Sequence, residues 1–405
     1  MEDPQDQGQR RLTPTEKITQ YAQMLSAQQH TLRERLYAPD AEKDLRTFSG
    51  PEAASWIGIP ESTLRQMDLD GETPFVQRQA NGRRAFSLEN INAIRHILAE
   101  KRPREALKFM PRRQPGEKAK ILAVSNFKGG SAKTTTSIHL AHFLALKGLR
   151  VLAVDLDPQA SLSALFNCQP EFDVGQNETL WAAIRYDDER VPLKQVIRKT
   201  YFDGLDLIPA NLELQEFEHS TPTAIVSGQA RGENIFYKRI ANVLTEVEDN
   251  YDVIIFDTPP QLGYLTLAAL FAASGLFITV NSAMIDIASM NQFLLMLSDI
   301  KGVIEDSGGE MNLDYLRFII TRYRDTDAPQ QLCSSFLRNL FGEDVLTNAA
   351  IETTAIQNAG LQKKSIYEVR AGDIGRDTLK RALESINGVN EEIYDLVKQS
   401  WGRAT

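Results

Sequence analysis

The chain contains 405 residues with a formal net charge of −9, a length that favours two or three domains, one of them large enough for a full α/β core. The charge is distributed unevenly: residues 1–120 carry 20 Lys and Arg against 17 Asp and Glu, whereas the remainder carries 25 against 37. Residues 78–120 alone carry 12 basic against 4 acidic side chains, so the overall acidity does not exclude nucleic acid as a partner.

The two cysteines, Cys168 and Cys333, are too few for a disulfide framework or a Cys-rich metal site. The N-terminus lacks the basic and apolar regions of an export signal. The longest apolar stretch, residues 266–280, is shorter than the roughly 20 residues that a membrane-spanning helix needs. We therefore expect a soluble cytoplasmic protein.

Residues 1–47 are polar and rich in Gln, and we expect an N-terminal helical arm there. Residues 15–36 have helix-forming composition with loosely spaced apolar side chains. Two interpretations stay open for this helix: it docks on a neighbouring part of the chain, or it pairs with a second subunit.

Residues 48–115 are predicted to form a DNA-binding domain and linker. Residues 51–57 and 61–67 suit two short helices joined by a turn at 58–60, the arrangement of a helix-turn-helix. Asn81-Gly82 suits a tight hairpin, and Ser87 caps a further helix. The segment resembles a MerR-like winged helix-turn-helix; the alternative is a small packing domain with solvated arginines.

The candidate DNA contacts of this module are polar or basic side chains on the second helix and the hairpin. Bases or phosphates would be contacted by Ser62, Thr63 and Arg65, and the DNA backbone by Arg78, Arg83 and Arg84. The Pro, Gly and charged residues between 101 and 116 predict a linker, with a domain boundary near residue 115.

From Lys118 onward, short β-branched runs alternate with longer helical patterns. The predicted strands are 121–124, 151–154, 205–208, 253–256, 277–280 and 318–321. This alternation predicts an α/β fold with a parallel, doubly wound sheet over residues 116–405. Ligands of such sheets bind at the carboxyl ends of the strands.

The first of these strands leads through a glycine-containing loop into a helix. Gly129 and Gly130 allow the backbone N–H groups to turn inward, and Lys133 supplies a cation at the start of the helix. The Thr134 hydroxyl then stands where it reaches Mg²⁺. Phe127 and Ala132 occupy the two glycine positions of the usual G-x-x-x-x-G-K-[ST] pattern.

Carboxylates follow two further strands. Asp155 and Asp157, in Asp-Leu-Asp-Pro-Gln, come after the second strand, and Asp257 ends the strand at 253–256. Carboxylates at strand ends can hold a metal-bound water and orient an attacking water. A structural turn is the alternative interpretation of Asp-x-Asp-Pro.

The loop 128–134 fits K-G-G-x-x-K-[ST] and resembles the deviant P-loop of the ParA/MinD ATPases, which usually have Gly where Ala132 stands. The resemblance implies ATP or ADP and Mg²⁺ as cofactors. It implies that Lys128 reaches a partner's nucleotide across a dimer, that Lys133 acts in catalysis, and that Asp157 positions the attacking water. The implied nucleotide contacts are Lys128, Gly129, Gly130, Ser131, Ala132, Lys133, Thr134 and Thr135, and the implied metal site is Thr134, Asp155 and Asp257.

Nearly the whole chain resembles the large plasmid partition ATPases, nearest to the RepA group of repABC replicons, and residues 348–368 resemble the C-terminal pattern of ParA proteins. The resemblance implies a slow ATPase that acts as a homodimer on the nucleoid. It implies operator-specific and nonspecific DNA binding, repression of its own operon, and stimulation by DNA and a centromere-binding ParB/RepB-type partner. The candidate arginines for nonspecific DNA binding are Arg322, Arg324, Arg370 and Arg376.

Three rival functions stay open. A MinD-like membrane-associated ATPase needs a basic amphipathic tail, but residues 393–401 carry few cations, which favours a docked helix and no membrane partner. An iron–sulfur reductase needs cysteines supplied across a dimer. A nonenzymatic repressor would keep the DNA-binding module and lack hydrolysis.

Overall fold

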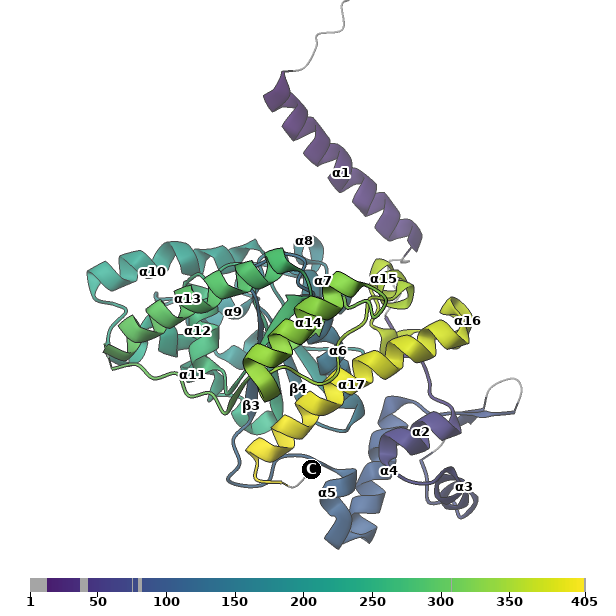
Figure 1. The fold of residues 1–405 in the computed structure, drawn as a ribbon. Helices are drawn as coiled ribbons and strands as arrows, with labels where there is room; N and C mark the ends of the chain where they lie inside the picture. The colour runs from purple at the N-terminus through teal and green to yellow at the C-terminus, as the bar shows by residue number, and fades with distance from the viewer. Residues whose placement is uncertain (1–12, 37–42, 75, 79–81, 307, 404–405) are drawn as a thin grey trace, which may run out of the picture. The chain divides into compact units, whose positions relative to one another are not determined.

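The structure is a computed structural model that describes residues 13–36, 43–74, 76–78, 82–306 and 308–403. The chain divides into two compact units, Met1–Asp44 and Leu45–Thr405. The first unit contains the predicted N-terminal helix as α1 (Pro14–Leu36), shown in Figure 1. Several apolar side chains of α1 are exposed: Ile18, Tyr21, Met24 and Leu25.

A seven-stranded sheet forms the centre of the second unit, in the order β5-β6-β4-β7-β3-β8-β9. The strands are β3 (Lys120–Ser125), β4 (Val151–Asp155), β5 (Arg198–Lys199), β6 (Leu205–Ile208), β7 (Val253–Asp257), β8 (Gly275–Asn281) and β9 (Tyr315–Thr321). All neighbouring strands are parallel except β5, an antiparallel edge strand beside β6. The six predicted strands and their parallel pairing are confirmed.

Helices cover both faces of this sheet (Figure 1). In β4, Val151 and Ala153 belong to one apolar core and Leu152 and Val154 to the other, because successive strand residues point to opposite faces. One face is covered by α6 (Lys133–Leu146), α7 (Ser161–Leu165), α15 (Thr354–Leu361) and α17 (Arg376–Ser400). The other is covered by α9 (Leu180–Ile184), α10 (Gln215–Ser227), α11 (Arg239–Leu244), α12 (Tyr264–Ala272), α13 (Met284–Asp306) and α14 (Ala328–Phe341).

The N-terminal part of the second unit consists of short elements. They are α2 (Gly50–Ile57), α3 (Glu61–Leu69), the hairpin β1 (Gln77–Arg78) with β2 (Arg84–Ala85), α4 (Leu88–Lys101) and α5 (Ala106–Phe109). Gly58 ends α2 in a left-handed conformation, φ +82°. Ser87 caps α4 as predicted, since its side chain accepts a hydrogen bond from the Asn90 amide. Asn81 of the predicted hairpin turn lies outside the described residues.

This N-terminal part packs directly against α6. The Arg95 side chain of α4 is 1% exposed and donates hydrogen bonds to the Leu146 carbonyl at the end of α6 and to the Trp56 carbonyl at the end of α2. The Trp56 ring meets Phe143 of α6 edge to face at 5.8 Å. Residues 45–405 therefore form one unit by their contacts, and the boundary predicted near residue 115 lies inside it.

The remaining helices connect these elements or follow them. Among them are α8 (Pro170–Asp173), α16 (Ala371–Ile374) and the 3-10 helix η8 (Ile366–Glu368). Across the described part of the chain, no helix combines the length and apolar character needed to cross a bilayer.

Candidate nucleotide-binding site

The three predicted motifs meet at one edge of the sheet. Strands β4, β7 and β3 are neighbours, and Asp257 at the end of β7 is in register with Asp155 of β4 and with Val124 of β3. The loop that follows β3 leads into α6, which begins at Lys133. The amino end of α6 and two strand-end carboxylates therefore border the same space.

The loop 126–132 is attached to the neighbouring strands by side chains that sequence reasoning missed. The Asn126 amide donates to the Thr279 carbonyl of β8 at 2.6 Å and accepts from the Lys128 amide at 2.9 Å. Thr321 of β9 donates to the Ser131 carbonyl at 3.0 Å. The loop conformation is thus fixed by buried polar contacts.

Ala132 adopts the left-handed conformation that glycine favours, with φ 68° and ψ 27°. It immediately precedes α6, so this turn sets the direction in which the helix leaves the loop. A Cβ in this conformation costs about 1 kcal/mol or more. The alanine at the family's glycine position therefore keeps the glycine-like backbone and carries its strain.

Asp257 is fully buried and accepts two hydroxyl hydrogen bonds from α6, from Thr134 Oγ1 at 2.7 Å and from Ser137 Oγ at 2.9 Å. Burial raises the pKa of this carboxyl to about 6. A hydroxyl paired with a carboxylate at the phosphate loop fits Mg²⁺, which takes few protein oxygens and keeps several waters.

Asp155 is also fully buried, and Ser163 donates to one of its oxygens through the backbone amide at 2.8 Å and the hydroxyl at 2.7 Å. Burial, together with the neighbouring Asp257, raises the pKa of Asp155 to about 8. A bound cation would offset the cost of holding both carboxylates charged. Asp157 is half-buried and accepts from the Gln159 amide at 2.9 Å.

The two lysines of the loop point to different places. Lys133 Nζ donates to the Lys128 carbonyl at 3.2 Å, across the loop, and burial lowers the pKa of Lys133. The Lys128 side chain instead forms an ion pair with Asp286 of α13. Only Lys133 therefore points into the loop in this conformation.

Two adjoining hollows lie beside the loop. The first, 510 Å³, is lined by Gly129, Gly130, Ser131, Ala132, Lys133, Thr134 and Thr135 together with Asp157. The second, 350 Å³, is lined by Arg322 at the end of β9, by Ile351, Glu352 and Thr353, and by Ile356 of α15. Gly130, Ala132 and Thr135 border both hollows, so the two hollows lie next to each other at the start of α6.

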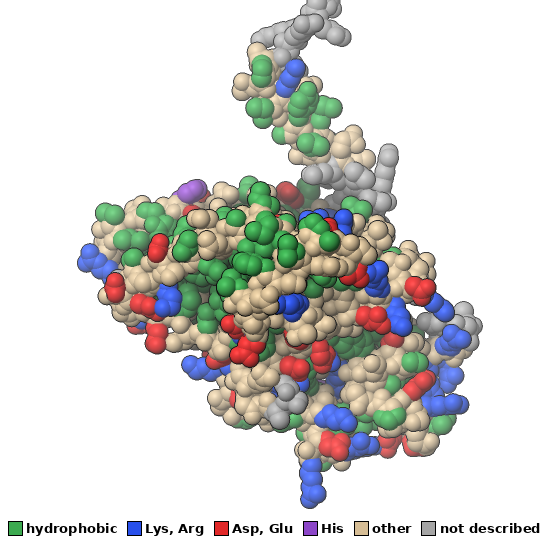
Figure 2. Space-filling model, in the orientation of Figure 1, with side chains coloured by type: hydrophobic (Ala, Val, Ile, Leu, Met, Phe, Trp, Pro, Cys, Tyr) green, Lys and Arg blue, Asp and Glu red, His purple; other side chains and the backbone are tan. Residues whose placement is uncertain are grey.

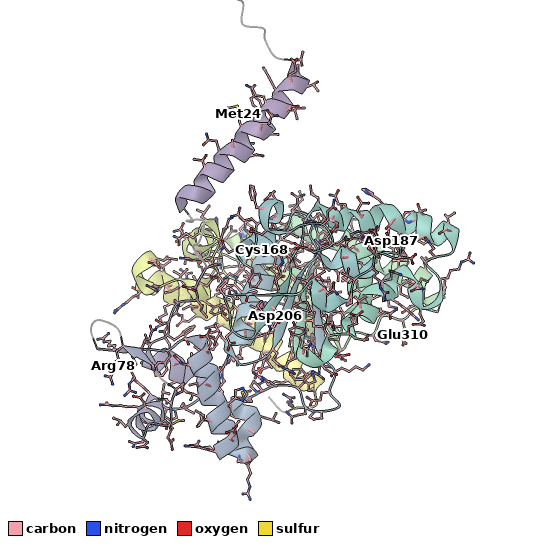
Figure 3. All side chains as sticks on the ribbon, turned by 180° about the vertical axis from the view of Figure 1, so that it is seen from behind. Met24, Arg78, Cys168, Asp187, Asp206 and Glu310 are labelled. Carbon is pink, nitrogen blue, oxygen red and sulfur yellow. The ribbon has the colours of Figure 1, made fainter. Side chains whose placement is uncertain are left out.

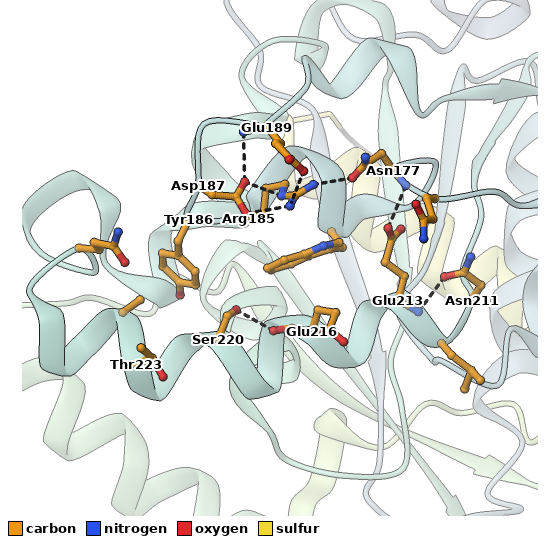
Figure 4. Close-up of a pocket in the computed structure, with 15 residues that line it drawn as sticks. Asn177, Arg185, Tyr186, Asp187, Glu189, Asn211, Glu213, Glu216, Ser220 and Thr223 are labelled. Carbon is orange, nitrogen blue, oxygen red and sulfur yellow. Dashed lines mark hydrogen bonds and ion pairs between the residues drawn. The ribbon is translucent and has the colours of Figure 1, made fainter.

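A larger hollow of 880 Å³ lies elsewhere, between α9 and α10 (Figure 4). Carboxylates, amides and the Trp181 and Tyr186 rings line it, and its Arg185 pairs with Asp187 and Glu189. None of the predicted site residues is among the described residues that line it.

The predicted DNA contacts gather on a third surface. Ser62 and Arg65 are exposed and Thr63 is half-buried on α3. A hollow of 630 Å³ between α3 and the hairpin is lined by Arg65, Arg78, Arg83 and Arg84. Arg84 also pairs with Asp68 of α3 at 2.7 Å, so it has a structural role within the module.

Comparison with known proteins shows what this chain is similar to. An AAA domain family model matches residues 119–307. The chain is 47% identical, over 391 residues covering 96% of both chains, to "Putative replication protein A" of Rhizobium rhizogenes. It is 29% identical to "Protein SopA" of Escherichia coli K12, covering 90% of this chain and 92% of the relative. The chain belongs to the ParA-type partition ATPases.

Solved structures agree with this family assignment at the level of the fold. A "Partition Protein" superposes with a TM-score of 0.66 at 20% identity, covering 95% of this chain and 99% of that one. A cobyrinic acid a,c-diamide synthase from Mycobacterium smegmatis with bound ATP analog and magnesium has a TM-score of 0.54 at 24% identity, covering 70% of this chain and 97% of that one. ATP or ADP with Mg²⁺ is the cofactor of this ParA-type ATPase, as predicted.

Proposed function

We propose that this partition ATPase binds DNA through its N-terminal module and positions plasmid or replicon copies as an ATP-bound homodimer on the nucleoid. The observation that carries the proposal is the convergence of Lys133, Thr134, Asp155 and Asp257 at adjacent strand ends, in the same unit as an arginine-lined surface. Repression of its own operon and stimulation by a centromere-binding ParB/RepB-type partner belong to the same proposal.

Each residue of the loop has a defined task in this proposal. The amides of residues 129–135 and the ammonium of Lys133 hold the phosphates, and the Thr134 hydroxyl and the Asp257 and Asp155 carboxylates hold the metal directly or through water. Bound Mg²⁺ supplies charge neutralisation on the phosphates. Asp157, which lines the phosphate hollow, orients the attacking water.

The hollow beside the start of α6 suits the nucleoside part of the ligand. It lies next to the phosphate hollow and is bordered by Ile351 and Ile356, whose apolar surfaces suit the face of a base. Sequence reasoning missed this wall, because its residues come from the turn after β9, from the segment before α15 and from α15 itself, far along the chain from the loop.

Lys128 is proposed to act only after dimerisation. It is held by Asp286, and next to Asp286 the side chains of Met284 and Ile285 are 66% and 71% exposed. Exposed apolar side chains beside a releasable cation suit a surface that a second subunit covers. In the dimer, Lys128 would leave Asp286 and reach the partner's nucleotide, which couples hydrolysis to association.

Residues 48–115 are proposed to act as a winged helix-turn-helix with its linker. The left-handed Gly58 turn, the exposed Ser62 and Arg65 of α3 and the arginine-lined hollow support this reading. Helix α3 would read base edges and the hairpin would hold the backbone, as in other helix-turn-helix proteins.

The test is ATP turnover with and without DNA for the wild type and three variants. Lys133→Ala should lose nucleotide binding, whereas Lys128→Ala should bind nucleotide and lose turnover. Asp157→Ala should bind ATP and remain a DNA-associated dimer in gel filtration. Equal turnover in all four proteins would refute the proposal. A wild-type protein that binds DNA without turnover would favour the nonenzymatic repressor. ATP-dependent binding to lipid vesicles would favour the MinD-like alternative.

A further inference from the structure

A buried serine that lies outside the predicted site residues contacts the Asp155 carboxylate. Ser163 is the third residue of α7, and both its backbone amide and its hydroxyl donate to Oδ2 of Asp155, at 2.8 Å and 2.7 Å. Both side chains are fully buried, so neither contributes to the molecular surface that Figure 2 shows in part, and bulk water cannot replace the contact. The hydroxyl is therefore a fixed part of the surroundings of this carboxylate.

The turn after β4 holds α7 against the end of that strand. Ala160, immediately before α7, has the left-handed conformation that glycine favours, with φ 54°, and its amide donates to the Asp157 carbonyl at 2.8 Å. Beyond α7, the amide of Cys168, which is labelled in Figure 3, donates to the Ser163 carbonyl at 3.0 Å. Backbone contacts on both sides of Ser163 thus fix its place beside Asp155.

The direction of the Ser163 hydroxyl is set by the neighbouring strand β6. The hydroxyl oxygen accepts a hydrogen bond at 2.9 Å from the amide of Ala210, two residues beyond the end of β6, and β6 pairs with β4 along its whole length. An amide can only donate, so the single hydrogen of the hydroxyl is left for Asp155. The pairing of β4 with β6 therefore determines which way this hydrogen bond runs.

The two oxygens of Asp155 have different partners. Oδ2 accepts both hydrogen bonds from Ser163, whereas Oδ1 accepts from the Asp157 amide at 3.2 Å. Each carboxylate oxygen accepts about two hydrogen bonds, so Oδ2 is saturated by Ser163 and Oδ1 retains acceptor capacity. Oδ1 is therefore the oxygen that is left for a cation or for a water bound to it.

We propose that Ser163 is a positioning residue for the magnesium site: it holds Asp155 in the orientation that leaves Oδ1 available to a metal-bound water. The inference rests on the proposed role of Asp155 and adds a residue that is not itself a ligand. Groups that orient a metal ligand change metal affinity by roughly 10–100-fold when they are removed. Because Ser163 contacts the carboxylate and not the nucleotide in this assignment, its loss should be felt only when the metal is present.

Ser163→Ala removes the hydroxyl and keeps the backbone amide. Isothermal titration calorimetry of the full chain measures the dissociation constant of AMPPNP, a nonhydrolysable ATP analogue, in EDTA and in excess Mg²⁺. The ratio of the two constants is the gain in affinity that Mg²⁺ provides. Ser163→Ala should reduce this ratio about tenfold and leave the constant in EDTA unchanged, which also checks that the variant is folded.

Ser274→Ala is the matched control. The Ser274 hydroxyl also accepts from a backbone amide and donates to a carbonyl, at 2.9 Å and 3.2 Å, and both groups belong to Ile121. These contacts join the amino ends of β8 and β3, at the edge of the sheet opposite the phosphate loop. The control therefore removes a hydroxyl with the same kind of partners, and it should keep the wild-type ratio.

The outcomes separate this inference from the proposed function. An unchanged ratio for Ser163→Ala would overturn the inference and leave the proposed metal ligands in place. An equal loss of affinity in EDTA and in Mg²⁺, or equal changes in the ratio for Ser163→Ala and Ser274→Ala, would also overturn it, because Ser163 would then support only the fold. A wild-type protein that binds AMPPNP equally in EDTA and in Mg²⁺ would overturn the proposed metal site together with the inference.

Discussion

His139 should make the stability of the protein depend on pH in a way that one substitution removes. This side chain of α6 is buried, with Nδ1 2.6 Å from the Thr135 carbonyl and Nε2 accepting from the Ile366 amide at 3.1 Å. Since an amide can only donate, Nε2 must be unprotonated and Nδ1 must carry the hydrogen. The ring is therefore held in one neutral tautomer.

The magnitude follows from the pKa. Burial lowers the pKa of His139 from its ordinary value to about 4, so the folded state resists a protonation that the unfolded state accepts at about 6.5. The sign is that of a depressed histidine pKa: the stability is complete above pH 6.5 and is lost as the pH falls toward 4. Between pH 7.5 and pH 5.0 the loss should be roughly 2 kcal/mol.

Urea unfolding of the metal-free protein at these two pH values tests the reasoning. His139→Gln keeps polar atoms at the position and removes the titration, so its stability should fall by roughly 2 kcal/mol less than that of the wild type between the two pH values. The comparison between variant and wild type is needed because the raised pKa values of Asp155 and Asp257 make the folded protein more stable as the pH falls, which opposes the effect of His139. His96→Gln, at an exposed position of α4, should keep the wild-type difference. An identical pH response of His139→Gln and the wild type would refute the assigned tautomer.

Substitutions at three other positions test the local reasoning. Ala132→Gly should leave the free energy of unfolding unchanged or raise it by up to about 1 kcal/mol, because glycine relieves the left-handed strain. Ala132→Val should lower the free energy of unfolding by more than about 1 kcal/mol. Urea unfolding measures both variants, and a destabilised glycine variant would contradict the argument. Asp286→Asn should increase the ATP-dependent dimer fraction in light scattering, since Lys128 loses its ion pair; an unchanged fraction would show that the pair does not restrain Lys128. Arg95→Met should lower the free energy of unfolding in urea by about 2–4 kcal/mol, because the carbonyls of Trp56 and Leu146 at two helix ends lose a charged donor. A loss below about 1 kcal/mol would show that these carbonyls find other hydrogen-bond partners.

The sequence predicted what depends on local pattern. Buried strands leave continuous β-branched runs, and the phosphate loop leaves a fixed spacing between Gly130 and Lys133, so the six strands and the position of the loop could be read directly. The contacts that fix the loop could not be read. The hydrogen bond from Asn126 to β8 depends on the strand register, and the hydrogen bond from Ser163 to Asp155 depends on the turn after β4. No residue spacing along the chain encodes either of these features.

Arg95 shows more clearly that tertiary contacts cannot be predicted from local sequence. It lies in a stretch where basic residues predominate, and that composition favours solvated side chains, yet it is among the most buried residues of the chain. What determines its burial is the packing of α4 against the carboxyl end of α6. Charge composition describes how many side chains face water, but tertiary packing decides which ones do.

The position of α6 joins the two proposed activities. A helix of 14 residues spans roughly 21 Å, with the phosphate loop at one end and, at the other, the Leu146 carbonyl that Arg95 holds. Arg112 donates to the Gly148 carbonyl just beyond, at 3.2 Å, and Trp56 packs on Phe143. If nucleotide displaces α6 along its axis, α2 and α4 must move with it or these buried contacts must break. Because linkage between binding sites is reciprocal, DNA bound at α3 would then change nucleotide affinity by the same factor as nucleotide changes DNA affinity.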